Sequence, residues 1–164
     1  MSEGISLLLD TSVWIDAFVP TRSRHQLVRR LLRNAIERDA KLLYPVRILP
    51  NVFYQVAAEA KRWWRQGGGE LTQAQAEACH SHAWECVNDM HELATAVGAD
   101  EADVWLALKY RTLHEDVEDN FVLAAAQRAQ ANYLVTSDMR LITKAPVAAL
   151  TPQDMLAVLC DLAE

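Results

Sequence analysis

Two short apolar segments, each closed by an aspartate, constrain the fold of this chain more than any other feature. One segment ends in Leu7-Leu8-Leu9-Asp10, and the other reads Tyr133-Leu134-Val135-Thr136-Ser137-Asp138. Short continuous apolar runs, without alternation, are typical of parallel strands that are covered on both faces. We therefore expect an α/β fold with a central parallel sheet, in which both aspartates lie at the carboxyl ends of strands.

Strand and helix signals alternate along the rest of the chain. We predict further strands at residues 41–44 and, weakly, at 147–150. Helices are predicted at 11–20, 23–38, 48–65, 72–90, 99–110, 120–129 and after Pro152. The glycines at 67–69 interrupt two of these helices, which predicts a helical hairpin that projects as an arm. Because no linker, repeat or low-complexity segment occurs, residues 1–164 are interpreted as a single domain.

The composition is that of an ordinary globular protein, with 51% apolar and 23% charged residues. A net charge of −6 argues against indiscriminate binding to nucleic acid, although a local basic stripe can coexist with an acidic pocket. Three cysteines are too few for a disulfide framework and fit a reducing compartment. No apolar run approaches the roughly 20 residues of a membrane span, so we expect a cytoplasmic protein that does not associate with membranes.

Two more aspartates, Asp116 and Asp119, open the helix predicted at 120–129. Residues three apart share one face of a helix, and helix starts face the same crevice as the carboxyl ends of parallel strands. On their own, Asp116 as N-cap and Asp119 in the first turn would stabilise any helix. Together with Asp10 and Asp138, they predict an oxygen-rich site whose mutual repulsion a Mg²⁺ or Mn²⁺ ion would neutralise. The pattern favours a metal-dependent phosphodiesterase.

Three segments resemble the hallmark motifs of PIN domains: residues 8–14 (LLDTSVW), 116–126 (DVEDNFVLAAA) and 131–138 (ANYLVTSD). Within this family, the sequences of the motifs are most similar to those of VapC-like toxins of bacterial toxin–antitoxin pairs. The resemblance implies a three-layer α/β/α PIN-like fold and Mg²⁺- or Mn²⁺-dependent endoribonuclease activity on RNA. It also implies a homodimer that is inhibited by a small antitoxin protein.

The resemblance also assigns roles to individual residues. It implies that Asp10, Asp119 and Asp138 bind the metal and that Asp116 is an additional catalytic carboxylate. Ser12 and Thr136 would orient Asp10 or Asp138 by hydrogen bonds, a supporting function that metal ligands commonly require.

Asn51 departs from the family pattern. PIN nucleases usually carry a glutamate in an apolar-Pro-Glu-apolar sequence, but here the chain reads Leu49-Pro50-Asn51-Val52. Glu59 lies about two helical turns further on, too far along the helix to substitute. The alternative hypothesis is therefore a catalytically degenerate PIN scaffold that binds RNA or protein. A receiver-type domain, which also has an acidic magnesium pocket, is disfavoured because its acids follow other strands.

Other features give weaker indications. The densest basic stretch is the favoured candidate for contact with RNA phosphates, and comprises Arg22, Arg24, Arg29, Arg30 and Arg33. Trp63 and Trp64 could stack on bases, but adjacent helical residues point apart, which places at least one in the core or an interface. Cys79, His82 and Cys86 share a helix face that cannot wrap a tetrahedral zinc ion, so we expect buried thiols. We assign none of the five histidines a role in the site.

Overall fold

A single sheet of five parallel strands forms the centre of the computed structural model, which describes residues 4–162. The strand order is β3-β2-β1-β4-β5. The strands are β1 (Ser6–Leu9), β2 (Lys41–Pro45), β3 (Thr95–Val97), β4 (Tyr133–Val135) and β5 (Ala149–Leu150).

The sheet order changes direction at β1. From β1 the chain proceeds through β2 to β3 on one side, and β4 and β5 are added on the other side. Leu7 therefore lies opposite Leu42 of β2 and Tyr133 of β4. In open α/β sheets such a reversal leaves a crevice beyond the carboxyl ends of the central strands, where ligands bind. Asp10 follows β1 at this place.

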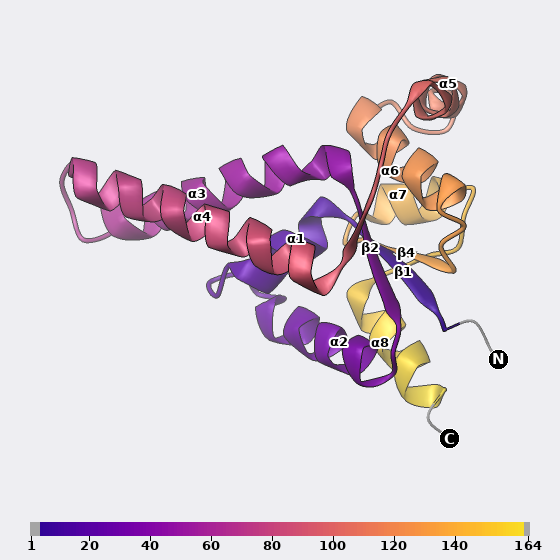
Figure 1. Cartoon of the computed structure of the whole chain (residues 1–164), viewed down its shortest axis with the longest axis horizontal. Helices are drawn as coiled ribbons and strands as arrows, with labels where there is room; N and C mark the ends of the chain where they lie inside the picture. The colour runs from indigo at the N-terminus through magenta and orange to yellow at the C-terminus, as the bar shows by residue number, and fades with distance from the viewer. Residues whose placement is uncertain (1–3, 163–164) are drawn as a thin grey trace.

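Helices cover both faces of the sheet, as Figure 1 shows. α2 and α8 lie together on one face, and α6 and α7 lie on the opposite face. The helices are α1 (Thr11–Phe18), α2 (His25–Glu37), α3 (Leu49–Arg65), α4 (Gln73–Leu93), α5 (Glu101–Tyr110), α6 (Val117–Arg128), α7 (Met139–Lys144) and α8 (Pro152–Asp161). A 3-10 turn (Val46–Ile48) joins β2 to α3. This arrangement confirms the three-layer α/β/α fold with a parallel sheet.

The predicted helical hairpin is present and extends beyond the sheet (Figure 1). It consists of α3 and α4, joined by the glycine turn, in which Gly68 and Gly69 have φ values of 86° and 90°. Thr72 caps α4 through a capping box with Gln75. Trp63 and Trp64 are 58% and 41% exposed, so neither lies in the core of this chain.

The strand β3 was missed by the sequence prediction. It contains only three residues, of which Thr95 and Ala96 are exposed, and it forms the edge of the sheet beside β2. A strand this short carries no periodic apolar pattern. It is defined by its hydrogen bonds to β2, and this pairing cannot be predicted from the sequence of the strand itself. The sheet therefore has five strands between residues 4 and 162, where four were expected.

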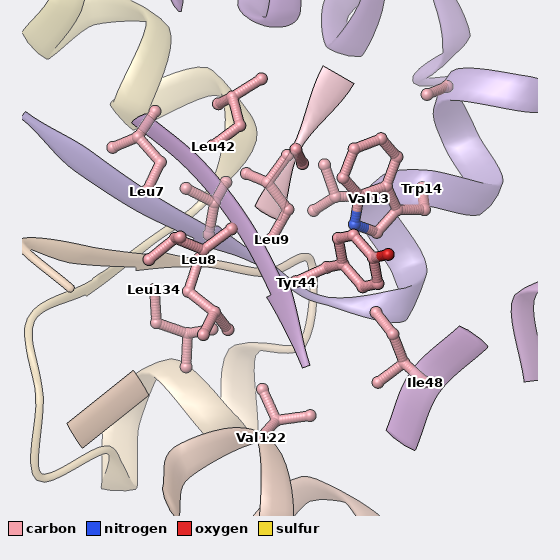
Figure 2. Packing of buried hydrophobic residues seen from close by; sticks show 14 of the residues in the cluster. Leu7, Leu8, Leu9, Val13, Trp14, Leu42, Tyr44, Ile48, Val122 and Leu134 are labelled. Atoms are coloured by element: carbon pink, nitrogen blue, oxygen red, sulfur yellow. The ribbon is translucent and has the colours of Figure 1, made fainter. Parts of the chain in front are cut away.

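The core is built around the two apolar segments that define the central strands. Leu7, Leu8 and Leu9 are fully buried, and in Figure 2 Leu9 is the one nearest to the aromatic pair Trp14 and Tyr44. The two rings meet edge to face, with centroids 6.2 Å apart and planes at 82°, a favourable geometry for aromatic pairs. This contact holds α1 against β2 and so fixes the position of Asp10, which precedes α1.

Helices long and apolar enough to cross a bilayer are not found between residues 4 and 162.

Candidate metal centre

A pocket of about 340 Å³ opens at the carboxyl edge of the sheet, where β1 and β4 end. Three of the predicted acids, Asp10, Asp119 and Asp138, line it. Its wall also contains Ser12 and Asn51. The fold therefore brings residues from four distant parts of the chain into one cavity.

Asp10 is the most deeply buried of the acids, at 7% exposure. It is the N-cap of α1, and its Oδ1 accepts a hydrogen bond from the backbone N–H of Thr11 at 2.7 Å. Its Oδ2 accepts one from Oγ1 of Thr136 at 2.8 Å. Burial raises the pKa of Asp10, and repulsion from Asp138 adds to this, while the hydrogen bonds from Thr136, Thr11 and Ser12 oppose it.

Thr136 joins the two strand-end aspartates. Its hydroxyl donates to Asp10 and accepts a hydrogen bond from the backbone N–H of Asp138 at 3.1 Å. Asp138 caps α7, where its Oδ1 accepts from the backbone N–H of Arg140 at 2.8 Å. Ser12 accepts from the backbone N–H of Ser137 at 3.2 Å. The loop after β4 is thus tied to the start of α1, which fixes the spacing of the two carboxylates.

Asp116 and Asp119 have different surroundings. Asp116 is exposed and is the N-cap of α6, accepting hydrogen bonds from the backbone N–H groups of Glu118 and Asp119 at 2.8 and 3.2 Å. Asp116 is not among the described residues that line the pocket. Asp119, one turn along, is half-buried and does line it. Asp116 therefore positions the helix that presents Asp119.

Repulsion among the carboxylates of the pocket affects Asp119 strongly. Burial raises its pKa to about 6, with further contributions from the negative charges of Asp10, Asp116 and Asp138. His114 acts in the opposite direction. A carboxyl whose pKa is raised by three other carboxylates occupies a site that a cation would stabilise.

The expectation that no histidine belongs to the site is wrong for His114. Its side chain is buried, and Nε2 lies 3.4 Å from Oδ2 of Asp119. Nδ1 accepts a hydrogen bond from the backbone N–H of Asp116 at 3.2 Å. Because an amide N–H only donates, Nδ1 carries no proton, and the ring hydrogen is on Nε2, the nitrogen that lies 3.4 Å from Asp119. His114 is therefore placed to orient Asp119 rather than to bind a cation.

These groups fit a hard divalent cation. Ligand-type atoms of His114, Asp119 and Asp138 lie within 4.8 Å of one another. With Nδ1 of His114 accepting from the backbone and the ring hydrogen on Nε2, the available donors are carboxylate oxygens, and Asp10 adds a further carboxylate to the same pocket. Oxygen ligands of this kind suit Mg²⁺ or Mn²⁺ better than zinc, which favours nitrogen and sulfur.

Asn51 lies in the pocket wall, as its place in the sequence suggested. Its Oδ1 accepts a hydrogen bond from Nε2 of Gln55 at 2.7 Å, and its Nδ2 lies 3.4 Å from Oε2 of Glu118. Glu118 also lines the pocket, and sequence reasoning did not select it. Glu59 forms an ion pair with Arg62 at 2.6 Å and lines a different groove on the arm.

Two arginines face the pocket, and only one of them was selected from the sequence. Arg22 lines the cavity and is held through Nε by Oδ1 of the buried Asp16 at 2.8 Å. Arg47 lines it as well, with its guanidinium 3.9 Å from the ring centre of Phe121. Within residues 4–162, the pocket wall does not include the other predicted arginines, Arg24, Arg29, Arg30 and Arg33. Arg47 follows β2 by two residues, so the rule that ligands bind beyond strand ends could have identified it.

The remaining candidate, on α4, has no ligand character. Cys79 and Cys86 are buried, as predicted. Burial, with the nearby charges of Asp89 and Glu85, raises the pKa of the Cys86 thiol to about 11. A metal ligand must be a thiolate, so this thiol is poorly suited to bind zinc.

The sheet order, the two helical layers and the acidic pocket at the switch point together define an α/β/α protein of the PIN type. The PIN domain family model matches residues 6–140, and the chain belongs to that family. The resemblance seen in the three sequence motifs is thereby confirmed. Comparison with curated proteins gives no sequence match.

Solved structures with a similar fold include two proteins bound to DNA fragments and one toxin. VapBC2 from Rickettsia felis, bound to a DNA fragment from its promoter, has a TM-score of 0.63 and 12% identity, covering 90% of this chain and 98% of that one. FitAB bound to a DNA fragment has a TM-score of 0.62 and 17% identity, with 90% and 95% covered. VapC20 of Mycobacterium tuberculosis, described as a toxin that cleaves the sarcin-ricin loop, has a TM-score of 0.60 and 11% identity, with 84% and 93% covered. At these identities the likeness concerns the fold alone.

Proposed function

We propose that the protein is an endoribonuclease dependent on Mg²⁺ or Mn²⁺, and that it is the toxin of a toxin–antitoxin pair. The observation that carries the proposal is the convergence of Asp10, Asp119 and Asp138 on one pocket at the switch point of the sheet. These acids come from three separate segments, and the pKa of Asp119 is raised by its carboxylate neighbours. Such a cluster is costly to the fold unless a bound cation offsets it.

In this proposal the side chains have distinct tasks. Asp10, Asp119 and Asp138 hold the cation, while Thr136, Ser12 and His114 fix the directions of these carboxylates. When bound, a divalent cation would supply a lower pKa for water and would neutralise charge that develops on the phosphate during hydrolysis. No side chain is required as a nucleophile.

The substrate phosphates need positive charge at the mouth of the pocket, which Arg22 and Arg47 supply. Each is held in place, Arg22 by Asp16 and Arg47 by the ring of Phe121. A guanidinium that is already oriented loses less freedom when it binds a phosphate. Arg24, Arg29, Arg30 and Arg33 are exposed and remain candidates for contacts farther along an RNA chain.

A catalytically degenerate scaffold that binds RNA or protein is the second candidate, and Asn51 is the observation that favours it. Position 51 is in the pocket wall but contributes no charge. The two proposals make different predictions for the purified protein. The nuclease should cut RNA when the cation is present, whereas the scaffold should not cut RNA under any condition.

The decisive experiment is cleavage of a mixed pool of structured RNA in Mn²⁺, in Mg²⁺ and in EDTA. An Asp119→Asn variant, purified identically, controls for contaminating nuclease. Metal-dependent cleavage that the variant lacks supports the nuclease. If the folded protein, freed of any bound partner, cuts no RNA with either metal, the nuclease proposal fails and the scaffold is favoured.

The proposal includes a small antitoxin and a homodimer as partners. Support comes from the structures of similar fold, of which VapBC2 and FitAB are bound to DNA fragments. Co-expression with a small reading frame adjacent to the gene, followed by affinity purification, tests the first partner. Light scattering of the isolated protein tests the second, and a monomer at micromolar concentration would contradict the homodimer.

A further inference from the structure

The position that lacks the usual glutamate is in contact with a glutamate from another helix. Glu118 lies in the first turn of α6 and lines the pocket with Asn51. The contact joins Nδ2 of Asn51 to Oε2 of Glu118 at 3.4 Å. It connects residues 67 positions apart in the sequence, so it exists only because the fold brings α3 and α6 together.

Hydrogen-bond chemistry fixes the orientation of the Asn51 amide. An ionised carboxylate only accepts hydrogen bonds, so Asn51 must direct its NH₂ group toward Glu118. Its oxygen then faces the other way, where Nε2 of Gln55 donates to it at 2.7 Å. The Asn51 oxygen thus accepts from Gln55, while the amide nitrogen contacts Glu118.

We propose that Glu118 supplies the carboxylate that position 51 lacks, and that Gln55 and Asn51 hold this carboxylate at the pocket. The inference rests on the proposed metal-dependent function. It deepens that function, because the site would retain a fourth acidic group in spite of Asn51. Asn51 would then be a positioning residue for Glu118.

A purely local role does not account for this arrangement. A glutamate in the first turn of a helix stabilises the helix dipole wherever its side chain points. That role requires neither the contact with Asn51 nor the hydrogen bond from Gln55. Glu115, three residues earlier, is also exposed but does not line the pocket. It therefore provides a control of equal charge on the same segment.

The test is the dissociation constant for Mn²⁺, measured by isothermal titration calorimetry without RNA. Glu118→Gln should weaken Mn²⁺ binding roughly tenfold, the lower end of the effect seen when groups that support a metal site are removed. The control Glu115→Gln should change it less than about twofold, because Glu115 does not line the pocket and its charge is screened by solvent. Adding Asn51→Glu to Glu118→Gln should restore most of the lost affinity, since the carboxylate returns to the other wall.

Equal Mn²⁺ affinities for Glu118→Gln and Glu115→Gln would overturn the inference, as would failure of Asn51→Glu to restore binding. The failure of the proposed function gives a different result. If Asp119→Asn binds Mn²⁺ as tightly as the unmodified protein, the metal centre itself is wrong. If Asp119→Asn loses binding but Glu118→Gln does not, only the assignment of Glu118 fails. Circular dichroism of each variant verifies that the fold is retained.

Discussion

Replacing Asp119 by asparagine should stabilise the metal-free protein, although the same change removes a proposed metal ligand. In the folded chain, burial and the neighbouring carboxylates raise the pKa of Asp119 to about 6, against 3.8 for an unperturbed aspartate. The unfolded chain therefore gives up the proton more readily than the folded chain. At 1.36 kcal/mol per pKa unit, ionised Asp119 reduces the free energy of unfolding by about 3 kcal/mol above pH 6.

The net gain should be smaller than this figure. Asp119 lies in the first turn of α6, where a negative charge gains up to about 1 kcal/mol from the helix dipole. We expect Asp119→Asn to be about 2 kcal/mol more stable than the unmodified protein in EDTA at pH 8.

The pH dependence gives an independent sign test. Because the folded pKa is raised, lowering the pH from 8 through 6 protonates Asp119 in the folded state and relieves the destabilisation. The advantage of the variant should therefore shrink below pH 6 and disappear near pH 4. Urea unfolding, followed by tryptophan fluorescence at pH 8, 6 and 4.5 in EDTA, measures these differences.

Saturating Mn²⁺ should reverse the order at pH 8, since only the unmodified protein gains binding energy from the cation. A variant that is less stable than the unmodified protein in EDTA at pH 8 would refute the electrostatic argument. Glu115→Gln serves again as the control, with an expected change within about 0.5 kcal/mol because its carboxylate is exposed.

Three further changes test other parts of the structure. Thr136→Val removes the hydroxyl that donates to Asp10. Urea unfolding should show a free energy of unfolding lower by about 2 kcal/mol, as for a buried hydrogen bond to a charged group, and an unchanged midpoint would contradict this prediction. Arg47→Gln should weaken RNA binding. The slope of log K against log salt should become shallower by about 0.7, as expected for one lost phosphate contact. A reduced Mn²⁺ affinity instead would mean that Arg47 acts on the metal. Arg128→Met leaves the buried Asp103 without its cation and should lower the midpoint of urea unfolding. An unchanged midpoint would show that the ion pair is dispensable.

The sequence was informative about the acids because they have structural roles that leave a local signal. Asp10, Asp116 and Asp138 are the N-caps of α1, α6 and α7. An aspartate that follows a strand and begins a helix is recognisable from the local pattern. In Asp10 and Asp138, the oxygen that caps the helix also fixes the side chain beside the pocket. The structural and functional interpretations of these residues are therefore not alternatives.

The residues that sequence reasoning missed depend on contacts between distant segments. His114 precedes α6 in a segment without helical or strand periodicity, and its burial follows from the packing of α5 against α6. Asn120 contributes as well, since its Nδ2 donates to the backbone oxygen of His114 at 2.9 Å. Glu118 has the pattern of an ordinary first-turn glutamate, and only its contact with Asn51 distinguishes it. Such partners cannot be found from spacing along one chain.

Asn51 illustrates why the charge of a site is better assessed in three dimensions than by position. Taken alone, the amide indicates a site with one carboxylate fewer and weaker cation binding. In the folded chain, a carboxylate from α6 faces the same cavity and contacts that amide. A glutamate at 51 would place a second negative charge beside Glu118, and like charges at this distance repel. Asn51 and Glu118 therefore suit each other electrostatically, which is why the two positions should be exchanged together in an experiment. In the presence of Glu118, Asn51→Glu alone should raise the repulsion in the metal-free pocket and lower the free energy of unfolding in EDTA.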